Sequence, residues 1–481
     1  MISLPDWMLR CASAAWLVGW ALVPGALRGD APNIVVIIAD DLGYGEIGIT
    51  SGMSIPTPAI DALAASGVTC RSGYVTSSYC SPSRAGILTG RYQSRFGYDI
   101  NPTGPRNLHP KAGVPVSEVM FVQRLADAGY ATGLFGKWHL GTADVFHPIR
   151  RGFDSFYGFL HEGHYYVPGP PYANVLTMVR DRSLPEGQRR RAGNLIRGNY
   201  APINEPAYDD DNPLLQSRGG ELFQVQESRY LTDAITDEAV AFLSVPREKP
   251  VCVVVAYNAV HSPMQAKLDR VSEYSSIKDP QRRIFAGMLA SLDRGVGRLC
   301  AAIDAMKSTE PTLVVFLSDN GGPTRELTSS NLPLRGEKGS LYEGGVRIPM
   351  IWSMPGRLPE GFVDDRVTLS LDIAATALDL AGVAPPSDAD GKSVMGWMPD
   401  PDAPSPHSTV YWRMPGGKAA LRQGDWKLVR PRNRQSFELY HLVKDIGETN
   451  DLATEMVIRR DDMTERYQQL DAAMSRPIQL D

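Results

Sequence analysis

Cysteine is scarce in this chain of 481 residues, which contains only five. Five cysteines are too few for the disulfide framework that holds together small secreted domains. An excess of basic residues is also missing, because 49 lysines and arginines face 54 aspartates and glutamates, for a net charge of −5. Without a global positive field, the chain is not expected to bind nucleic acid. Hydrophobic content of 43% and charged content of 21% are ordinary for a globular protein.

Long apolar runs are rare, and the clearest one lies near the start of the chain, over residues 11–27. Its length suits the apolar region of a signal peptide and is short for a membrane span. We therefore predict a signal peptide over residues 1–29, a periplasmic or secreted protein, and no stable membrane insertion. An uncleaved anchor or a misassigned start codon is the alternative, since the preceding residues are only weakly basic and no clear cleavage site follows.

Apolar runs and helix-period stretches alternate along the rest of the chain. Continuous apolar runs are typical of strands that are buried on both faces of a parallel sheet; they occur at residues 33–39, 251–256 and 312–317, with shorter candidates at 132–136 and 349–352. Helical periodicity occurs at 59–66, 117–128, 232–243, 283–305 and 370–380. This alternation predicts an α/β fold with a large mixed, mostly parallel sheet sandwiched by helices.

A second, smaller unit is predicted after Pro385-Pro386-Ser387. Short strand patterns punctuated by turns predict a small antiparallel sheet; they lie at 407–412, 419–423, 426–429 and 437–440, before a helical stretch at 453–474. The predicted organisation is a large domain over residues 30–385 and a C-terminal α+β subdomain over residues 386–481.

Oxygen-bearing side chains follow two of the predicted buried strands. Asp40 and Asp41 come directly after the first, and Asp319 and Asn320 after a later one. In parallel sheets, ligands collect beyond the carboxyl ends of the strands. Three carboxylates and an amide, without imidazole, favour calcium or magnesium over zinc. The alternative is that each pair merely caps the helix that follows it.

Cys80-Ser81-Pro82-Ser83-Arg84 is followed directly by Ala-Gly-Ile-Leu-Thr-Gly-Arg at 85–91. C-x-P-x-R followed by G-x-x-T-G resembles the signature of the formylglycine-dependent sulfatases of the alkaline phosphatase superfamily. The resemblance extends from residue 32 to about residue 452 and includes arylsulfatases and carbohydrate sulfatases of the N-acetylgalactosamine-6-sulfatase type. It implies an alkaline-phosphatase-like fold for residues 30–385, which would be the catalytic domain.

The resemblance also implies that Cys80 is the nucleophile position and is converted to formylglycine (3-oxoalanine) by a formylglycine-generating enzyme. One hydroxyl of the formylglycine hydrate attacks sulfur, and the other later loses its proton and expels sulfate. One Ca²⁺ per chain is implied at the matching family positions, with its ligands at Asp40, Asp41, Cys80, Asp319 and Asn320. Arg84 lies one helical turn after Cys80 and is implied to point back at it.

Three further segments match motifs of the family. Gly-Lys-Trp-His-Leu-Gly at 136–141 places Lys137 as a ligand of the sulfuryl oxygens and His139 as the base of the elimination step. In Tyr-Asn-Ala-Val-His-Ser-Pro at 257–263, His261 is the candidate general acid for the leaving alcohol; a neighbouring carboxylate would raise its pKa. Leu334 to Gly345 matches R-G-x-K-x-x-x-x-E-G-G and places Lys338 on the sulfuryl group, whereas Glu343 and Arg347 shape the loop. Glu46 stands where relatives often carry Asp and is not expected to bind the metal.

Residues 161–221 form the least regular segment. Its arginines would attract an anionic polymer; they are Arg180, Arg182, Arg189, Arg190, Arg191 and Arg197. Tyr165, Tyr166 and Tyr172 would offer a stacking face for pyranose rings, although a solvated surface loop is the alternative. His161 and His164 are not expected to be ligands, and residues 209–212 are interpreted as a surface turn.

These observations predict a sulfuric ester hydrolase that removes sulfate from a sulfate monoester, either an aryl sulfate or, as the natural substrate, a sulfated carbohydrate. The first alternative is a phosphate or phosphonate ester hydrolase of the same superfamily, although the extra histidine and aspartate ligands of two-metal relatives are not found. The second is a non-catalytic binder of sulfated glycans, if Cys80 remains a thiol.

Overall fold

The computed structural model of the protein describes residues 31–51, 55–168, 174–179, 194–197, 212–218, 220–306, 308, 311–431 and 435–480. The predicted signal peptide and most of the arginine-rich part of 161–221 lie outside these residues. Among the described helices, none combines the length and the apolar character that crossing a membrane requires.

Ten strands form the central sheet, in the order β13-β2-β12-β11-β1-β9-β3-β4-β7-β8. Their bounds are β1 (Ile34–Ala39), β2 (Val68–Tyr74), β3 (Ala131–Lys137), β4 (Ser155–Phe159), β7 (Leu215–Arg218), β8 (Glu221–Gln224), β9 (Val251–Ala256), β11 (Leu313–Ser318), β12 (Met350–Ser353) and β13 (Phe362–Leu369). The sheet is mixed: β1 pairs in parallel with β9 and β11, whereas β12 is antiparallel to both β11 and β2.

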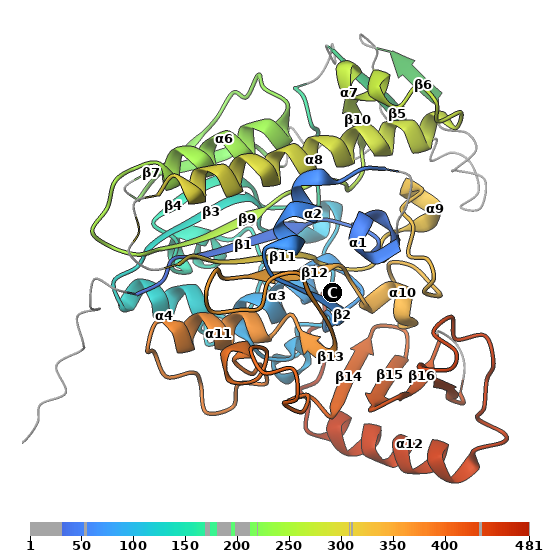
Figure 1. Cartoon of the computed structure of the whole chain (residues 1–481). Helices are drawn as coiled ribbons and strands as arrows, with labels where there is room; N and C mark the ends of the chain where they lie inside the picture. Colours follow the sequence, from blue (N-terminus) through green and yellow to red (C-terminus); the bar gives the residue numbers. More distant parts are fainter. Residues whose placement is uncertain are drawn as a thin grey trace, which may run out of the picture.

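Helices lie on both faces of the sheet (Figure 1), and the side chains of β1 alternate between the two core layers. Val35 and Ile37 point to the layer that contains α2 (Pro58–Ala65), α6 (Leu231–Leu243) and α8 (Pro280–Asp304). Val36 and Ile38 point to the opposite layer, with α3 (Cys80–Thr89), α4 (Phe121–Asp127) and α11 (Asp372–Leu380). Successive strand residues face opposite sides of a sheet, so a strand whose residues are all apolar needs helices on both faces.

The C-terminal sheet consists of four antiparallel strands in the order β14-β15-β16-β17 and lies beside α12 (Val457–Ala472) at one end of the molecule (Figure 1). Its strands are β14 (Thr409–Met414), β15 (Lys418–Gln423), β16 (Trp426–Arg430) and β17 (Glu438–His441). Trp412 joins it to the larger sheet, because its indole Nε1 donates to the Val75 carbonyl at 2.7 Å. The predicted fold class, a mostly parallel α/β sheet with a small C-terminal antiparallel sheet, is confirmed.

The remaining elements are short. A three-stranded sheet contains β10 (Met264–Lys267), β5 (Val175–Val179) and β6 (Asn194–Arg197). The other α-helices are α1 (Gly48–Ser51), α7 (Leu268–Glu273), α9 (Thr324–Leu327) and α10 (Glu343–Val346). No disulfide joins the four cysteines in the described part of the chain, and Cys252 is fully buried on β9.

Candidate active site

Neighbouring strand ends bring the predicted oxygen ligands together. Ala39 and Ser318 are partners in the parallel pairing of β1 with β11, so the residues that follow them, Asp40-Asp41 and Asp319-Asn320, leave the sheet side by side. The backbone N–H of Asp41 donates to Asp319 Oδ1 at 3.3 Å. Asp41 adopts a φ of +66°, in the left-handed region that side chains other than glycine seldom occupy. The turn therefore directs the carboxylates of Asp40 and Asp41 toward the carboxylate of Asp319.

Cys80 begins α3 and lies against this carboxylate cluster. Its Sγ is 3.5 Å from Asp40 Oδ1, and one ligand atom each of Asp40, Asp41, Cys80 and Asp319 lies within 4.8 Å of the others. All four side chains are buried. Burial raises the pKa of the Cys80 thiol, against the opposing effect of Lys137 and Lys338, so the unmodified side chain is a neutral thiol.

Three cations surround the three carboxylates. Arg84 Nε donates to Asp319 Oδ2 at 2.9 Å, and Lys137 Nζ donates to Asp40 Oδ2 at 2.6 Å. Lys338 Nζ lies 2.7 Å from Asp41 Oδ1. The cations come from α3, from the end of β3 and from the loop before α10, which are far apart in the sequence. The buried charges are therefore matched in number, and each buried carboxylate has a cation partner.

The carboxylates differ in their affinity for protons. Burial works to raise the pKa of Asp41, but Lys338 and His261 lower it to about 2. Burial, reinforced by the charge of Asp40, raises the pKa of Asp319 to about 6, and the nearby Arg84 only partly offsets this. Burial and the nearby Asp40 charge thus make Asp319, compared with Asp41, the carboxylate that more readily takes up a proton or another cation.

Gly136 explains how Lys137 reaches the cluster. At its φ of +115°, a Cβ atom would lie 1.9 Å from the Ala256 carbonyl oxygen on the neighbouring strand β9. Only glycine permits this close approach of the two strands at the end of β3. The close approach of β3 to β9 therefore explains why glycine stands at the first position of the Gly-Lys-Trp-His-Leu-Gly motif.

His139 is held in one tautomer by a backbone contact. Its Nε2 lies 2.8 Å from the Pro102 carbonyl oxygen, which can only accept a hydrogen bond, so Nε2 carries the hydrogen and donates it while Nδ1 carries the lone pair. Nδ1 is buried and finds no hydrogen-bond partner among the described residues. Burial first, and then Lys137, lowers the pKa of His139 well below its ordinary value. A neutral imidazole whose Nδ1 lone pair has no hydrogen-bond partner can accept a proton and so act as a base.

His261 lies on the other side of the cluster. Its Nε2 is 3.6 Å from Asp41 Oδ2, and it forms a second compact group with Asp40 and Cys80. The sequence interpretation noted that a carboxylate neighbour would raise the pKa of this histidine. Asp41 does act in that direction, but burial and the charge of Lys338 prevail and lower the pKa of His261 to about 4.

Tyr166 supports the loop that carries His261, a role that the sequence did not reveal. Its hydroxyl lies 2.7 Å from the Asn258 carbonyl oxygen and 2.8 Å from that of His261. The side chain is fully buried, and its ring stacks on Tyr230 with a centroid separation of 5.4 Å. The prediction that Tyr166 offers a stacking face to sugar rings is therefore wrong, because the ring is enclosed by the protein.

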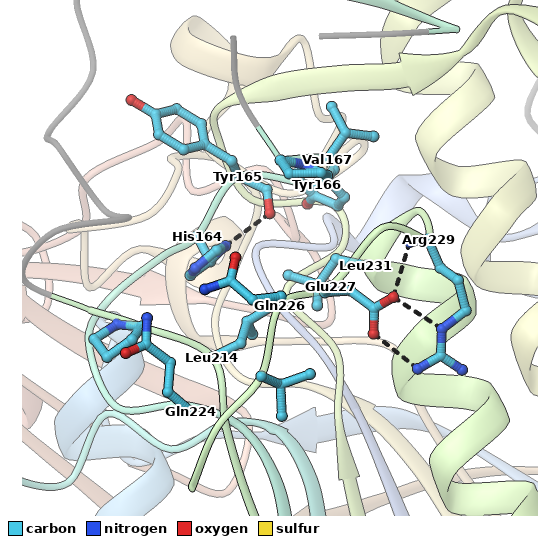
Figure 2. A pocket seen from close by; sticks show the side chains of 13 residues that line it. His164, Tyr165, Tyr166, Val167, Leu214, Gln224, Gln226, Glu227, Arg229 and Leu231 are labelled. Atoms are coloured by element: carbon cyan, nitrogen blue, oxygen red, sulfur yellow. Dashed lines mark hydrogen bonds and ion pairs between the residues drawn. The ribbon is translucent and has the colours of Figure 1, made fainter. Parts of the chain in front are cut away.

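A small pocket of about 220 Å³ is lined in part by Tyr166 and its neighbours (Figure 2). Figure 2 shows the Glu227 carboxylate pairing with the Arg229 guanidinium at its wall, at 2.7 Å. His164 and Tyr165 also line it and are nearly buried, and His164 Nδ1 lies 2.9 Å from the Tyr165 carbonyl oxygen. Neither histidine of this segment, His161 or His164, belongs to a metal-ligand group of the described residues.

Residues 209–212 were interpreted as a surface turn, and for Asn212 this is wrong. Asn212 is buried, its Oδ1 accepts from the backbone N–H groups of Leu160 and His161, and its Nδ2 donates to the Gly163 carbonyl. An asparagine can satisfy several backbone groups at once, and it fixes the chain after β4 here. Residues 209–211 lie outside the described part, as do Tyr172 and all of the arginines named in that segment except Arg197, for which the backbone alone is described.

Glu46 does not join the carboxylate cluster. Its two carboxylate oxygens accept from Arg282 Nη1 at 2.7 Å and Nη2 at 2.8 Å, in a bidentate pair that also receives the Ser330 backbone N–H. Arg282 lies on α8, and no feature of its local sequence indicated this partner. Glu343 likewise takes a structural role, since it contacts Arg347 at 3.2 Å and Lys427 at 2.7 Å.

A sulfatase family profile matches residues 32–383, and a profile for the C-terminal part of N-sulphoglucosamine sulphohydrolase matches residues 336–475. N-acetylgalactosamine-6-sulfatase from Canis lupus familiaris is 32% identical over 393 residues, covering 79% of this chain and 67% of the relative. Steryl-sulfatase from Mus musculus is 31% identical over 418 residues, covering 76% of this chain and 64% of the relative.

A solved structure, Ps i-CgsB in complex with k-i-k-neocarrahexaose, is also similar, with a TM-score of 0.79 and 32% identity, covering 93% of this chain and 94% of that one. The PsFucS1 sulfatase from Pseudoalteromonas sp. gives a TM-score of 0.75 at 26% identity, with 92% and 91% covered. With its core motifs gathered at one buried site and a family profile matching well over half of its length, the chain belongs to the sulfatase family and is a sulfuric ester hydrolase.

Proposed function

We propose that this protein is a calcium-dependent sulfatase that removes sulfate from a sulfated carbohydrate, with formylglycine formed from Cys80 as its nucleophile. The observation that carries the proposal is the convergence of Cys80 with three carboxylates and three cations at one buried place. The carbohydrate substrate is supported by the names of two relatives, an N-acetylgalactosamine-6-sulfatase and a structure that holds a neocarrahexaose.

The oxygen donors fit a hard divalent cation. Asp40, Asp41 and Asp319 crowd together, and the pKa of Asp319 is raised to about 6, primarily by burial and next by Asp40. Asn320 Oδ1 is buried and accepts no hydrogen bond from the described residues, which leaves a neutral oxygen available as a ligand. Such a donor set suits calcium. When bound, calcium would supply Lewis acidity and a fixed position for a sulfuryl oxygen.

In this proposal, the basic side chains and His261 act at the two ends of the bond between sulfur and the leaving oxygen. Arg84 and Lys137 contact Asp319 and Asp40, on the side where Cys80 lies. Lys338 contacts Asp41, as does His261. We infer that Arg84 and Lys137 hold the sulfuryl oxygens near the nucleophile, and that Lys338 stabilises the charge that develops toward the leaving oxygen.

Proton transfer falls to the two histidines. As the bond between sulfur and the sugar oxygen breaks, His261 donates a proton to that oxygen, so that an alcohol leaves instead of an alkoxide. Because burial and Lys338 lower the pKa of His261 to about 4, this role requires the negative charge of the bound ester to raise it. His139, with its Nε2 hydrogen committed to the Pro102 carbonyl, accepts a proton at Nδ1 when sulfate is released. Maturation by a formylglycine-generating enzyme and export through the segment at residues 1–29 belong to the same proposal.

Mass spectrometry of the peptide that spans residues 76–84, together with an aryl sulfate assay on the same protein, tests this proposal. We expect an aldehyde or its hydrate at Cys80, activity that falls on chelation and returns with calcium, and little turnover of the matching aryl phosphate. Cys80→Ala should abolish turnover and leave the fold intact. Cys300→Ala, at a half-buried thiol on α8, is the matched control and should keep full activity. An aldehyde-bearing protein that releases sulfate from no ester would contradict the proposal.

A further inference from the structure

A cavity of about 790 Å³ lies between the loop at residues 99–106 and the C-terminal sheet. Its walls come from that loop, the turn between β14 and β15, α12, and the chain end at residues 477–480. Sites that bind organic ligands usually measure roughly 300–1,000 Å³, so the space is sufficient for several sugar units. We call this cavity the basic groove, for the reason that follows.

Positive charge predominates on the walls of the basic groove. Four basic side chains line it, and two acidic ones do; they are Arg106, Arg413, Lys418 and Arg430, with Asp99 and Asp471. Both aspartates face Arg413, at 2.6 Å and 3.4 Å. The groove therefore has an excess of two positive charges, in a chain whose net charge is −5. A local excess of this kind attracts anions.

Two of these arginines contact only uncharged groups within the described structure, and Arg430 lies over the Phe437 ring, 4.9 Å from its centroid. Arg106 Nη2 donates to the Leu480 carbonyl at 3.4 Å, and Arg430 Nε donates to the Gly417 carbonyl at 2.9 Å. Neither pairs with a carboxylate of the described residues. Arg106 is exposed and Arg430 is half-buried. A guanidinium without a carboxylate partner can donate hydrogen bonds to the oxygens of a sulfate group, whose spacing its N–H groups match.

The basic groove borders the active site on two sides. Tyr79 lines the groove and immediately precedes Cys80, and Asn101 Oδ1, from the same wall, accepts the Ser81 backbone N–H at 3.1 Å. On the other side, Lys418 Nζ donates to the Gly339 carbonyl, next to Lys338. The groove and the site at Cys80 therefore share a wall, formed by Tyr79, Asn101 and the backbone at Gly339.

We propose that the basic groove binds further sulfate-bearing sugar units of the same polymer whose ester is cleaved at Cys80. Arg106 and Arg430 pair with sulfate groups on those units, and the groove selects sulfated oligosaccharides over single sugars. This inference rests on the proposed function, since it names the substrate class of the same site.

The test uses the full chain with the double substitution Arg106→Gln and Arg430→Gln. The probes are an aryl sulfate and sulfated oligosaccharides of two, four and six sugars, prepared from carrageenan and from chondroitin 6-sulfate. The matched control is Arg294→Gln with Arg298→Gln, which removes the same charge from two exposed positions on α8. Dissociation constants are measured by calorimetry in the Cys80→Ala background, where no substrate is consumed.

An arginine–sulfate contact at an exposed position contributes roughly a factor of two to five. The groove variant should therefore raise the Kd and the KM of a four- or six-sugar substrate by about 4- to 25-fold, with aryl sulfate turnover unchanged. The control variant should match the wild type on every probe. Added salt should weaken oligosaccharide binding by the wild type more than by the groove variant.

Unchanged oligosaccharide binding in the groove variant would overturn the inference, as would equal losses on aryl sulfate and oligosaccharide or no binding of any oligosaccharide by Cys80→Ala protein. These failures differ from a failure of the proposed function. That function fails when formylglycine-bearing wild type releases no sulfate from the aryl ester, a result that does not depend on Arg106 or Arg430.

Discussion

One buried lysine forms ion pairs with two buried carboxylates where α10 meets the C-terminal sheet. Lys427 Nζ, on β16, lies 2.7 Å from Glu343 Oε1 and 3.3 Å from Glu448 Oε1, and all three side chains are fully buried. Glu343 also accepts a hydrogen bond from the Tyr74 hydroxyl at 2.6 Å and faces Arg347. Lys427 and Arg347 stabilise the ionised form of Glu343. Of the two glutamates, Glu448 is therefore the one that holds a proton more readily. Burial raises the pKa of Glu448 to about 7, reinforced by the charge of Glu343 and opposed by Lys427.

This raised pKa makes stability depend on pH. In the unfolded chain, Glu448 ionises near its ordinary pKa of 4.5, whereas in the fold it keeps its proton until about pH 7. Between these two values the folded state binds more protons than the unfolded state. The contribution of Glu448 to the free energy of unfolding is therefore fully present below about pH 4.5, falls as the pH rises, and is lost above about pH 7.

Replacement of Glu448 by Gln removes this titration and preserves the size of the side chain. The interval from pKa 4.5 to about 7 corresponds to roughly 3 kcal/mol, at about 1.36 kcal/mol per pH unit. An unfolding entropy of about 2.1 cal/mol/K per residue gives roughly 1 kcal/mol/K for 481 residues. Glu448→Gln should therefore melt about 3 °C above the wild type at about pH 8.5, and less than about 1 °C above it at about pH 5.

Thermal melting of both proteins across this pH range measures the effect. Glu465→Gln, at an exposed position on α12, removes a carboxylate with no buried partner and should leave the difference near zero at every pH. A Glu448→Gln protein that melts below the wild type at about pH 8.5, or by an amount that does not vary with pH, would refute the reasoning.

Three further substitutions test the site and its supports. His261→Ala should lower kcat/KM for a sugar sulfate by roughly 10²- to 10⁴-fold and less for an aryl sulfate, whose good leaving group needs little protonation; equal losses would exclude the acid role. Tyr166→Phe removes a hydroxyl that donates to the loop of His261 and should lower kcat by up to about tenfold with KM unchanged; a change in KM alone would contradict positioning. Arg282→Met leaves Glu46 buried and unpaired and should cost roughly 3–5 kcal/mol of stability, most of which Glu46→Gln restores in the double variant; additive losses on melting would contradict the pair.

The sequence predicted the strands that lie in the middle of the sheet and missed those nearer its edge. Strands β1, β9 and β11 are buried on both faces, so every residue except Ser318 at the end of β11 is apolar, which makes the pattern clear. Strand β2 carries Arg71, which contacts Asp365 on β13 at 3.4 Å, and β13 has an irregular register after Asp364. Polar residues in such strands are satisfied by tertiary partners that a local pattern does not contain.

The same division holds for the candidate site. Cys80, Lys137 and Lys338 stand in motifs whose spacing is local, and the structure gathers them, although their chemical roles stay predictions. The partner of Glu46 could not be predicted, because it depends on which helix crosses above the loop. The burial of Tyr166 could not be predicted either. Tyr166 lies in a segment of irregular composition, where the sequence does not distinguish a ring that faces solvent from one that packs on Tyr230.

The contacts around Lys338 show that the C-terminal sheet takes part in building the active site. Lys338 follows Arg335, whose guanidinium donates to the Tyr440 hydroxyl on β17 at 3.1 Å, and Lys418 on β15 holds the Gly339 carbonyl on the other side. Glu343, at the end of the same loop, is compensated by Lys427 on β16. Three strands of the small sheet therefore fix both ends of the loop that delivers Lys338 to Asp41. A profile of C-terminal sulfatase sequence that begins at residue 336 spans both this loop and the small sheet, in keeping with the contacts that join them.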